Sequence, residues 1–181
     1  MDFNEVISKR YSVRKFTDEK VPQEIIEEIL EFGRIAPSGD NRQPTVVYVL
    51  DEEKIGNIKE NPLIKIHPVF FKSKQALLVC YSKKLEMKRT HDKFCFGITD
   101  SSIATTYMML KITELGLGSV WIGWFNPKLL KETLEIPDEY EPASILTFGY
   151  IHKSCRPYEK HNIRKPMEHF KQNFKENNRK I

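Results

Sequence analysis

The feature that most constrains how this chain folds is a set of apolar, β-branched segments. They are spaced unevenly among segments of helical periodicity. VVYVL (46–50), ALLVCYS (76–82) and SILTFGYI (144–151) are typical of buried strands, and SVWIGWF (119–125) reads as a strand that runs into a loop. Strands and helices alternate without the regular spacing of βαβ units. The sequence therefore predicts an α+β fold with a central sheet between helices.

Capping residues and apolar periodicity indicate where the helices lie. Asp2 followed by Glu5 has the pattern of a capping box, and Pro22 suits the first turn of a second helix. Further helices are predicted from about 52 to 60 and after Asn126-Pro127. The residues expected to face inward are Phe3, Val6 and Ile7 in the first helix and Ile25, Ile26, Ile29, Leu30 and Gly33 in the second.

A long helix is expected to be capped by Asp100 and Ser101 and to end at Gly116. From His152 onward the chain is polar, and we expect it to wrap a surface before a short last helix. The apolar side chains assigned to these two helices are Ile103, Tyr107, Leu110 and Leu115 in the long one and Met167, Phe170 and Phe174 in the last.

Length and composition suit one globular domain, residues 1–181, with 40% hydrophobic and 30% charged residues. No segment approaches the roughly 20 apolar residues that cross a bilayer, and the N-terminus lacks the pattern of a secretion signal. We therefore expect a cytoplasmic protein with no membrane association. Cys80, Cys95 and Cys155 are too scattered for a zinc knuckle, and the five histidines form no ligand-spaced cluster, so no metal is expected.

The net charge of +4 is compatible with nucleic-acid binding or with an anionic small ligand. Basic residues are interleaved with acids and prolines, and no recognition-helix pattern occurs, so nucleic-acid binding is the weaker hypothesis. A dinucleotide fingerprint is excluded because Trp121 stands where Gly116-Leu-Gly118 would need its third glycine. No P-loop motif occurs either.

The segment RYSVRKF (10–16) reads as extended, and alternate residues of an extended chain share one face. Arg10, Ser12 and Arg14 then lie together. Two guanidiniums and a hydroxyl can clamp an anion, because guanidinium forks match phosphate oxygens. An exposed polar strand face explains this segment equally well when it is considered alone.

Three later segments also suit a ligand. The loop APSGDNRQP (36–44) offers short donors and backbone amides for a flat heterocycle, although a plain helix-to-strand loop is the better explanation when the segment is considered alone. GLGSVWIGWF (116–125) sets glycines beside aromatic residues, so that backbone can approach a planar ligand; a core strand with a tight turn is the alternative. Arg164 can complete a phosphate site, although a solvated face explains most charges of the basic stretch 156–165.

Taken in order, RYSVRKF, APSGDNRQP and the stretch from Asp100 through ELGLGSVWIGWF to LTFGYI resemble the nitroreductase family over nearly the whole chain. The resemblance implies a mostly antiparallel sheet, an intertwined homodimer and one FMN in each of two sites at the subunit interface. It also implies NAD(P)H as the reductant. Electrons would pass through FMN to an electron-poor small molecule, such as a nitroaromatic or a quinone, in a ping-pong cycle.

The family blocks also imply roles for single residues. Arg10, Ser12 and Arg14 would hold the FMN phosphate, ribityl chain and pyrimidine edge, and Arg164 would join them at the phosphate. Ile122 and Gly123 would lie beside the flavin ring, with a backbone N–H near N5. The loop that reaches the flavin from the partner subunit would contribute Pro37, Ser38, Gly39 and Asn41.

No acidic, basic or nucleophilic side chain is expected to act in catalysis, because flavin itself carries the electron chemistry. Between Asp51 and Asp100 the chain is too short for the extra helices that cover the active site in larger family members. Two other hypotheses stay open. One is an FMN-binding storage or sensor protein with little turnover, and the other is a relative that uses reduced flavin with oxygen or removes halide.

Overall fold

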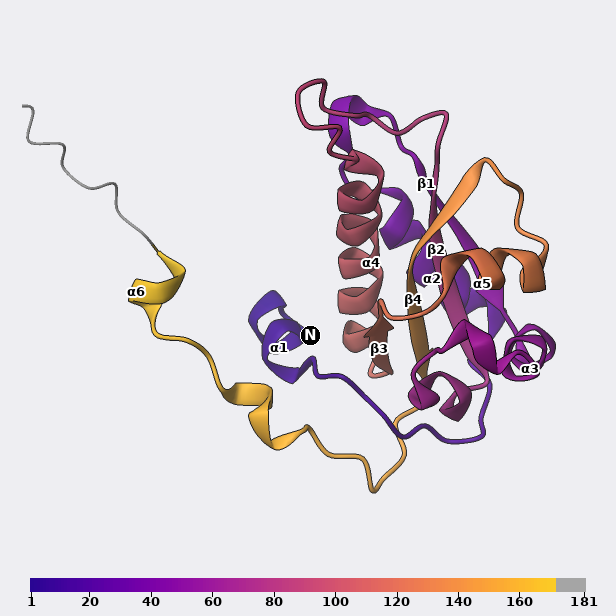
Figure 1. Cartoon of the computed structure of the whole chain (residues 1–181). Coiled ribbons are helices and arrows are strands. Elements are labelled where there is room, and N and C mark those ends of the chain that lie inside the picture. The colour runs from indigo at the N-terminus through magenta and orange to yellow at the C-terminus, as the bar shows by residue number, and fades with distance from the viewer. Residues whose placement is uncertain (172–181) are drawn as a thin grey trace, which may run out of the picture.

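A four-stranded sheet forms the centre of the protein in the computed structural model, which describes residues 1–171 (Figure 1). The strand order is β1-β2-β4-β3, and all neighbouring strands are antiparallel. This confirms the expected α+β class and the mostly antiparallel sheet. The strands are β1 (Thr45–Leu50), β2 (Gln75–Ser82), β3 (Gly118–Ile122) and β4 (Tyr140–Gly149).

Helices cover one face of the sheet as a packed layer. They are α2 (Gln23–Arg34) and α4 (Phe96–Glu114). Because the opposite face is covered as well, β2 is buried on both sides, which explains why ALLVCYS is a continuous apolar run. The side chains of this first layer include Ile26, Ile29, Met108 and Ile112 from the helices and Leu77, Val79, Leu146 and Phe148 from the sheet.

The second face is covered by α3 (Glu52–Lys59), α5 (Pro127–Leu134) and two short 3-10 helices, η2 (Pro62–Ile64) and η3 (Pro68–Lys72). Cys80 points into this layer, and its burial raises the pKa of its thiol to about 12. The cysteine therefore acts as a small apolar side chain, as the sequence predicts.

The N-terminal helix α1 (Phe3–Lys9) begins with the predicted capping box. The Glu5 backbone N–H donates to the Asp2 carboxylate at 2.9 Å, and the Asp2 backbone N–H donates to Glu5 at 3.2 Å. Val6 is buried, but Phe3 is 71% exposed and Ile7 is 49% exposed. The prediction that these last two face inward is wrong for the single chain, because α1 lies at the edge of the molecule, beside α4 (Figure 1).

The long helix α4 begins at Phe96, so the prediction that Asp100 and Ser101 cap it is wrong. Both lie inside the helix, where they are buried. The predicted end is confirmed, since Gly116 follows the helix with φ +77°.

The predicted inner face of α4 is wrong at Tyr107, although Leu115, just past the helix, does pack against the core as predicted. Ala104, Met108 and Ile112 pack inward, whereas Tyr107 is exposed. The helix carries apolar residues on both sides, so periodicity alone could not select the side that meets the sheet. A second apolar face of α4 consequently points outward.

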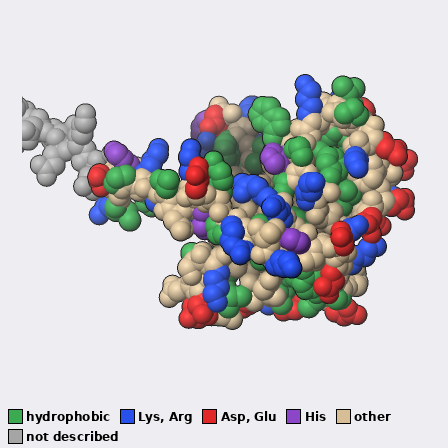
Figure 2. Space-filling model, turned by 90° about the horizontal axis from the view of Figure 1, so that it is seen from below, with side chains coloured by type: hydrophobic (Ala, Val, Ile, Leu, Met, Phe, Trp, Pro, Cys, Tyr) green, Lys and Arg blue, Asp and Glu red, His purple; other side chains and the backbone are tan. Residues whose placement is uncertain are grey.

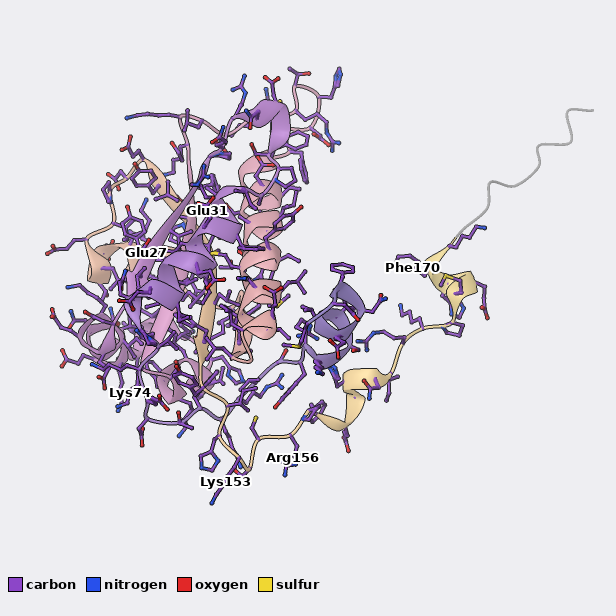
Figure 3. The ribbon with its side chains drawn as sticks, turned by 180° about the vertical axis from the view of Figure 1, so that it is seen from behind. Glu27, Glu31, Lys74, Lys153, Arg156 and Phe170 are labelled. Carbon is purple, nitrogen blue, oxygen red and sulfur yellow. The ribbon has the colours of Figure 1, made fainter. Side chains whose placement is uncertain are left out.

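The chain leaves the body after Cys155 as a C-terminal arm, residues 156–171. It contains η4 (Glu159–Asn162) and α6 (Met167–Phe170). Figure 3 shows Arg156 near the base of the arm and Phe170 near its far end, away from the sheet. Phe170 is 85% exposed. The predicted last helix is present but short, and Phe174 lies outside the described residues.

Candidate functional site

The N-terminal segment 10–16 is extended, as predicted, and lies against β3. The Val13 backbone N–H donates to the Ser119 carbonyl at 2.9 Å, and Ser12 forms an isolated parallel bridge with Ser119. Val13 is buried and its neighbours Ser12 and Arg14 are not, as alternation predicts. The alternation stops there, because Lys15 is also exposed and Phe16 is buried. Arg14 donates from its guanidinium to the Ser12 carbonyl at 3.1 Å.

Arg10 and Arg164 lie near one another. Partial burial lowers the pKa of the Arg10 guanidinium, and the positive charge of Arg164 lowers this pKa further. Arg164 uses one guanidinium nitrogen to donate to carbonyls of its own arm, at His161 and Ile163. The arm thus brings a second cation to the end of α1.

None of the three guanidiniums, Arg10, Arg14 and Arg164, forms an ion pair with a carboxylate within residues 1–171. A surface hollow of about 290 Å³ adjoins Arg10 and is also lined by Lys9, Gly116, Gly118 and Ile151. Figure 2 shows Lys and Arg side chains gathered on this underside of the molecule, beside the base of the arm. Unpaired guanidiniums beside a hollow favour an anionic ligand, because binding supplies the missing countercharge.

Ile122 and Gly123 lie where β3 ends. The Ile122 side chain is buried in the core, so that residue can offer a ligand only its backbone. Gly123 is exposed, and a β-carbon added there would meet no atom within 4 Å. The backbone at Gly123 is therefore open to a flat ligand. The next residue, Trp124, is 78% exposed, and the sequence reasoning gave it no role.

The loop 37–43 has a strained backbone. Asp40, Asn41 and Gln43 all have positive φ, between 50° and 53°. This region is unfavourable for residues with a β-carbon by roughly 1 kcal/mol each, and less for Asp and Asn. The Gln43 backbone N–H donates to the Ser38 hydroxyl at 2.9 Å, which closes the loop on itself. Positive φ at three positions out of four marks the loop as a candidate binding element.

Asp100 holds this loop to α4. The Gly39 backbone N–H donates to the Asp100 carboxylate at 3.0 Å, and Asp100 is 4% exposed. A hollow of about 270 Å³ lies beside the contact, lined in part by Pro37, Ser38 and Gln43. The sequence reasoning missed this role because it treated Asp100 as a helix cap.

The structure separates the predicted site residues into two groups. The first group lies near the C-terminal end of α4, where Thr113 lines the hollow beside Arg10. It consists of Arg10, Ser12 and Arg14 on the N-terminal segment beside β3, and Arg164 on the arm. Gly39 and its loop lie near the N-terminal part of α4, at Asp100. The 13 residues from 100 to 113 correspond to about 20 Å of helix. One chain therefore does not bring the two groups together.

Across residues 1–171, no three His, Cys, Asp or Glu side chains are grouped as metal ligands. No described helix is long and apolar enough to cross a membrane.

Fold and site together define a class of α+β protein with an antiparallel sheet. Along one edge of this sheet lie an open glycine and arginines that have no carboxylate partner within residues 1–171. Residues 7–94 and 77–150 match the model of the nitroreductase family. The chain belongs to that family, which confirms the resemblance found in the sequence.

Individual relatives agree with this assignment. The chain is 39% identical to a nitroreductase family protein from Clostridium difficile 630, with a TM-score of 0.82 over 95% of this chain and 98% of that one. It is 27% identical to an FMN-dependent nitroreductase from Clostridium difficile R20291, with a TM-score of 0.74 over 96% and 99% of the two chains. It is also 35% identical to the FMN reductase [NAD(P)H] of Bacillus subtilis, over 81% of this chain and 66% of the relative.

Proposed function

We propose that this protein is an FMN-dependent oxidoreductase that uses NAD(P)H to reduce an electron-poor small molecule, such as a nitroaromatic or a quinone. The observation that carries the proposal is that Arg10 and Arg164, which lie near one another, form no ion pair with a carboxylate within residues 1–171. The FMN-related names of the relatives agree with it. When bound, FMN supplies the two-electron chemistry, and the protein supplies position and charge.

The residues along this edge fit FMN by their chemistry. Arg10 and Arg164 would bind the phosphate, since it is a dianion that needs charge-assisted donors. Ser12 and Arg14 would bind the ribityl chain and the pyrimidine edge, where a guanidinium stabilises negative charge. The Gly123 backbone N–H would donate to the ring from an open position that any side chain would obstruct.

We propose that the site is completed by a second copy of the chain, in a homodimer. The loop 37–43 and the Arg10 group lie too far apart on one chain to share a ligand closely, so a partner's loop would have to supply the missing side. An apolar hollow of about 460 Å³ lies between α1, α2 and α4 and is lined in part by Phe3, Ile35, Tyr107 and Leu110. Large exposed apolar surfaces favour association. The exposed side chains of the arm offer further surface to a partner.

Light scattering after size exclusion tests the dimer. Tyr107→Asp places a charge on the apolar face and should produce a monomer that retains little FMN. Leu63→Asp is the control, because Leu63 is an exposed apolar residue on η2, on the other layer of the molecule. A Tyr107→Asp protein that stays dimeric, or a wild-type monomer saturated with FMN, would exclude this interface.

The activity is tested by the visible spectrum of the purified protein, recorded again under anaerobic conditions after addition of NADH or NADPH. A flavin spectrum that bleaches supports the oxidoreductase. A flavin spectrum that persists with both donors favours the storage or sensor alternative, and a protein that binds no added FMN excludes both. Parallel lines in double-reciprocal plots would support the ping-pong order. We also propose a cytoplasmic location, where thiols such as Cys80, Cys95 and Cys155 stay free.

A further inference from the structure

The loop 37–43 adopts its strained conformation with little regular structure of its own. It contains a three-residue 3-10 helix, η1 (Gly39–Asn41), and in this segment Asp40, Asn41 and Gln43 have left-handed backbone. Such a conformation persists only where surrounding contacts determine it.

Asp100 makes the hydrogen bond to the loop that comes from the rigid core. Its carboxylate is 4% exposed, projects from the second turn of α4 and accepts the Gly39 backbone N–H at 3.0 Å. Gly39 also lies close to Met87, because a β-carbon on Gly39 would stand 3.2 Å from the Met87 methyl group. The Met87 methyl group and the Asp100 carboxylate thus lie near the same side of Gly39, and the hydrogen bond from its amide to Asp100 is the polar attachment of the loop to α4.

The remaining hydrogen bonds of the loop are internal or at its end. Ser38 and Asn41 each bind Gln43 within the loop. Thr45, at the start of β1, faces the Ser101 hydroxyl at 3.4 Å, and Ser101 also donates to the Cys80 carbonyl at 3.3 Å. Ser101 thus connects the same turn of α4 to the sheet and not to the loop, which makes it a natural comparison for Asp100.

We propose that Asp100 is a positioning residue, whose buried carboxylate holds the strained loop in the shape that presents Ser38 and Asn41 to the ligand. This inference deepens the proposed function, on which its ligand-binding part rests. The restraint of the loop itself does not depend on which ligand is bound. Asp100 acts through the Gly39 amide and needs no contact with the ligand.

Amide hydrogen exchange of the full-length protein, read by mass spectrometry over the loop and by NMR at Gly39, tests the restraint directly. Asp100→Leu retains a side chain of similar size but removes the acceptor, so the loop amides should exchange about tenfold faster or more. Asp100→Asn keeps an oxygen that can accept the same bond and should restore slow exchange. Ser101→Ala is the matched control and should leave the loop unchanged.

Fast exchange at Gly39 in the wild-type protein would overturn the inference without any variant, and this keeps the test decisive if Asp100→Leu does not fold. The inference also fails if Asp100→Leu protects the loop as the wild type does, or if Ser101→Ala loosens it as much as Asp100→Leu does.

An FMN titration separates this inference from the proposed function. Asp100→Leu should raise the FMN dissociation constant about tenfold or more, and Asp100→Asn should return it to near the wild-type value. If the wild-type protein binds no FMN, the proposed function is wrong, and hydrogen exchange still decides the restraint. If wild type and Asp100→Leu bind FMN equally while Arg10→Ala binds it weakly, the site is correct and the role of Asp100 in ligand binding is wrong.

Discussion

Val13 donates its backbone N–H to the carbonyl of Ser119 at 2.9 Å, and this bond attaches the N-terminal segment to the edge strand β3. The segment can approach so closely because the neighbouring residue is Gly118. A β-carbon there would lie 2.5 Å from a methyl group of Val13 and 2.8 Å from the Ile151 side chain. The position of Arg10 and Ser12 therefore depends on the missing side chain at Gly118.

Gly118→Ala should destabilise the protein and weaken its hold on FMN. The added methyl group overlaps Val13, and overpacking of this kind costs about 1–3 kcal/mol. Urea unfolding measures the loss, and the flavin content of the purified protein reports the displaced clamp. Gly123→Ala is the matched control for the stability measurement alone, because no protein atom lies near its β-carbon, and its free energy of unfolding should stay within about 0.5 kcal/mol of wild type. Equal stability of both variants with wild type would contradict the close approach.

Arg10→Ala should raise the FMN dissociation constant by roughly 10- to 150-fold, since a charge-assisted hydrogen bond contributes about 1.5–3 kcal/mol. Titration of FMN fluorescence measures the change. Lys128→Ala removes a positive charge that is exposed on α5 and should leave the constant unchanged. If purified Arg10→Ala carries as much flavin as wild type, Arg10 does not bind the phosphate.

The elements predicted correctly are those that local chemistry determines. Three features follow from neighbouring residues alone: the capping box at Asp2, the left-handed residue Gly116, and the extended segment from Arg10 to Phe16. The buried strand ALLVCYS is equally local, because its apolar run is continuous. These features could be predicted without any knowledge of the partners across the fold.

The errors all concern contacts between distant parts of the chain. Asp100 has the side chain of a helix cap, but it accepts the amide of Gly39, 61 residues earlier. α4 is apolar on two sides, so its sequence could not show that Tyr107 faces outward. Phe3 is exposed for the same reason, because no local pattern shows which apolar side chains are covered within the single chain.

Thr147→Val should stabilise the protein. Thr147 lies on β4 between Ala76 and Val120, and its buried hydroxyl has no hydrogen-bond partner among the described residues. Replacing the hydroxyl with a methyl group removes the penalty of burying an unpaired polar atom, so the free energy of unfolding should rise by about 1 kcal/mol.

Thr105→Val provides the comparison, since this residue is equally buried. Its hydroxyl donates to the Ser101 carbonyl at 2.7 Å and lies 3.2 Å from the Ser144 hydroxyl. The same substitution there should lower the free energy of unfolding by about 1 kcal/mol. If the two valine variants shift the urea midpoint in the same direction, an unpaired hydroxyl is not the cause.

Glu52, at the start of α3, should govern part of the acid stability. Its carboxylate binds Lys20 and Lys74, each at 2.7 Å, and these two bonds lower its pKa from 4.5 to about 2. Because the pKa is lowered in the folded state, the stabilisation is complete above pH 4.5 and is lost as the pH falls from there toward 2. Glu52→Gln should therefore show a smaller loss of stability across this window than wild type, measured by urea unfolding at each pH.

At neutral pH, high salt should reduce the difference in free energy of unfolding between wild type and Glu52→Gln, because salt screens exposed ion pairs. Glu53→Gln is the adjacent control, since among residues 1–171 Glu53 forms an ion pair with its neighbour Lys54 alone. Between pH 4.5 and 2, its free energy of unfolding should fall as much as that of wild type. Glu52→Gln could instead lose the same free energy of unfolding as wild type at every pH between 2 and 4.5. In that case Lys20 and Lys74 do not bind this carboxylate in solution, and the ion pairs from Glu52 to the segments before α2 and β2 contribute nothing to stability.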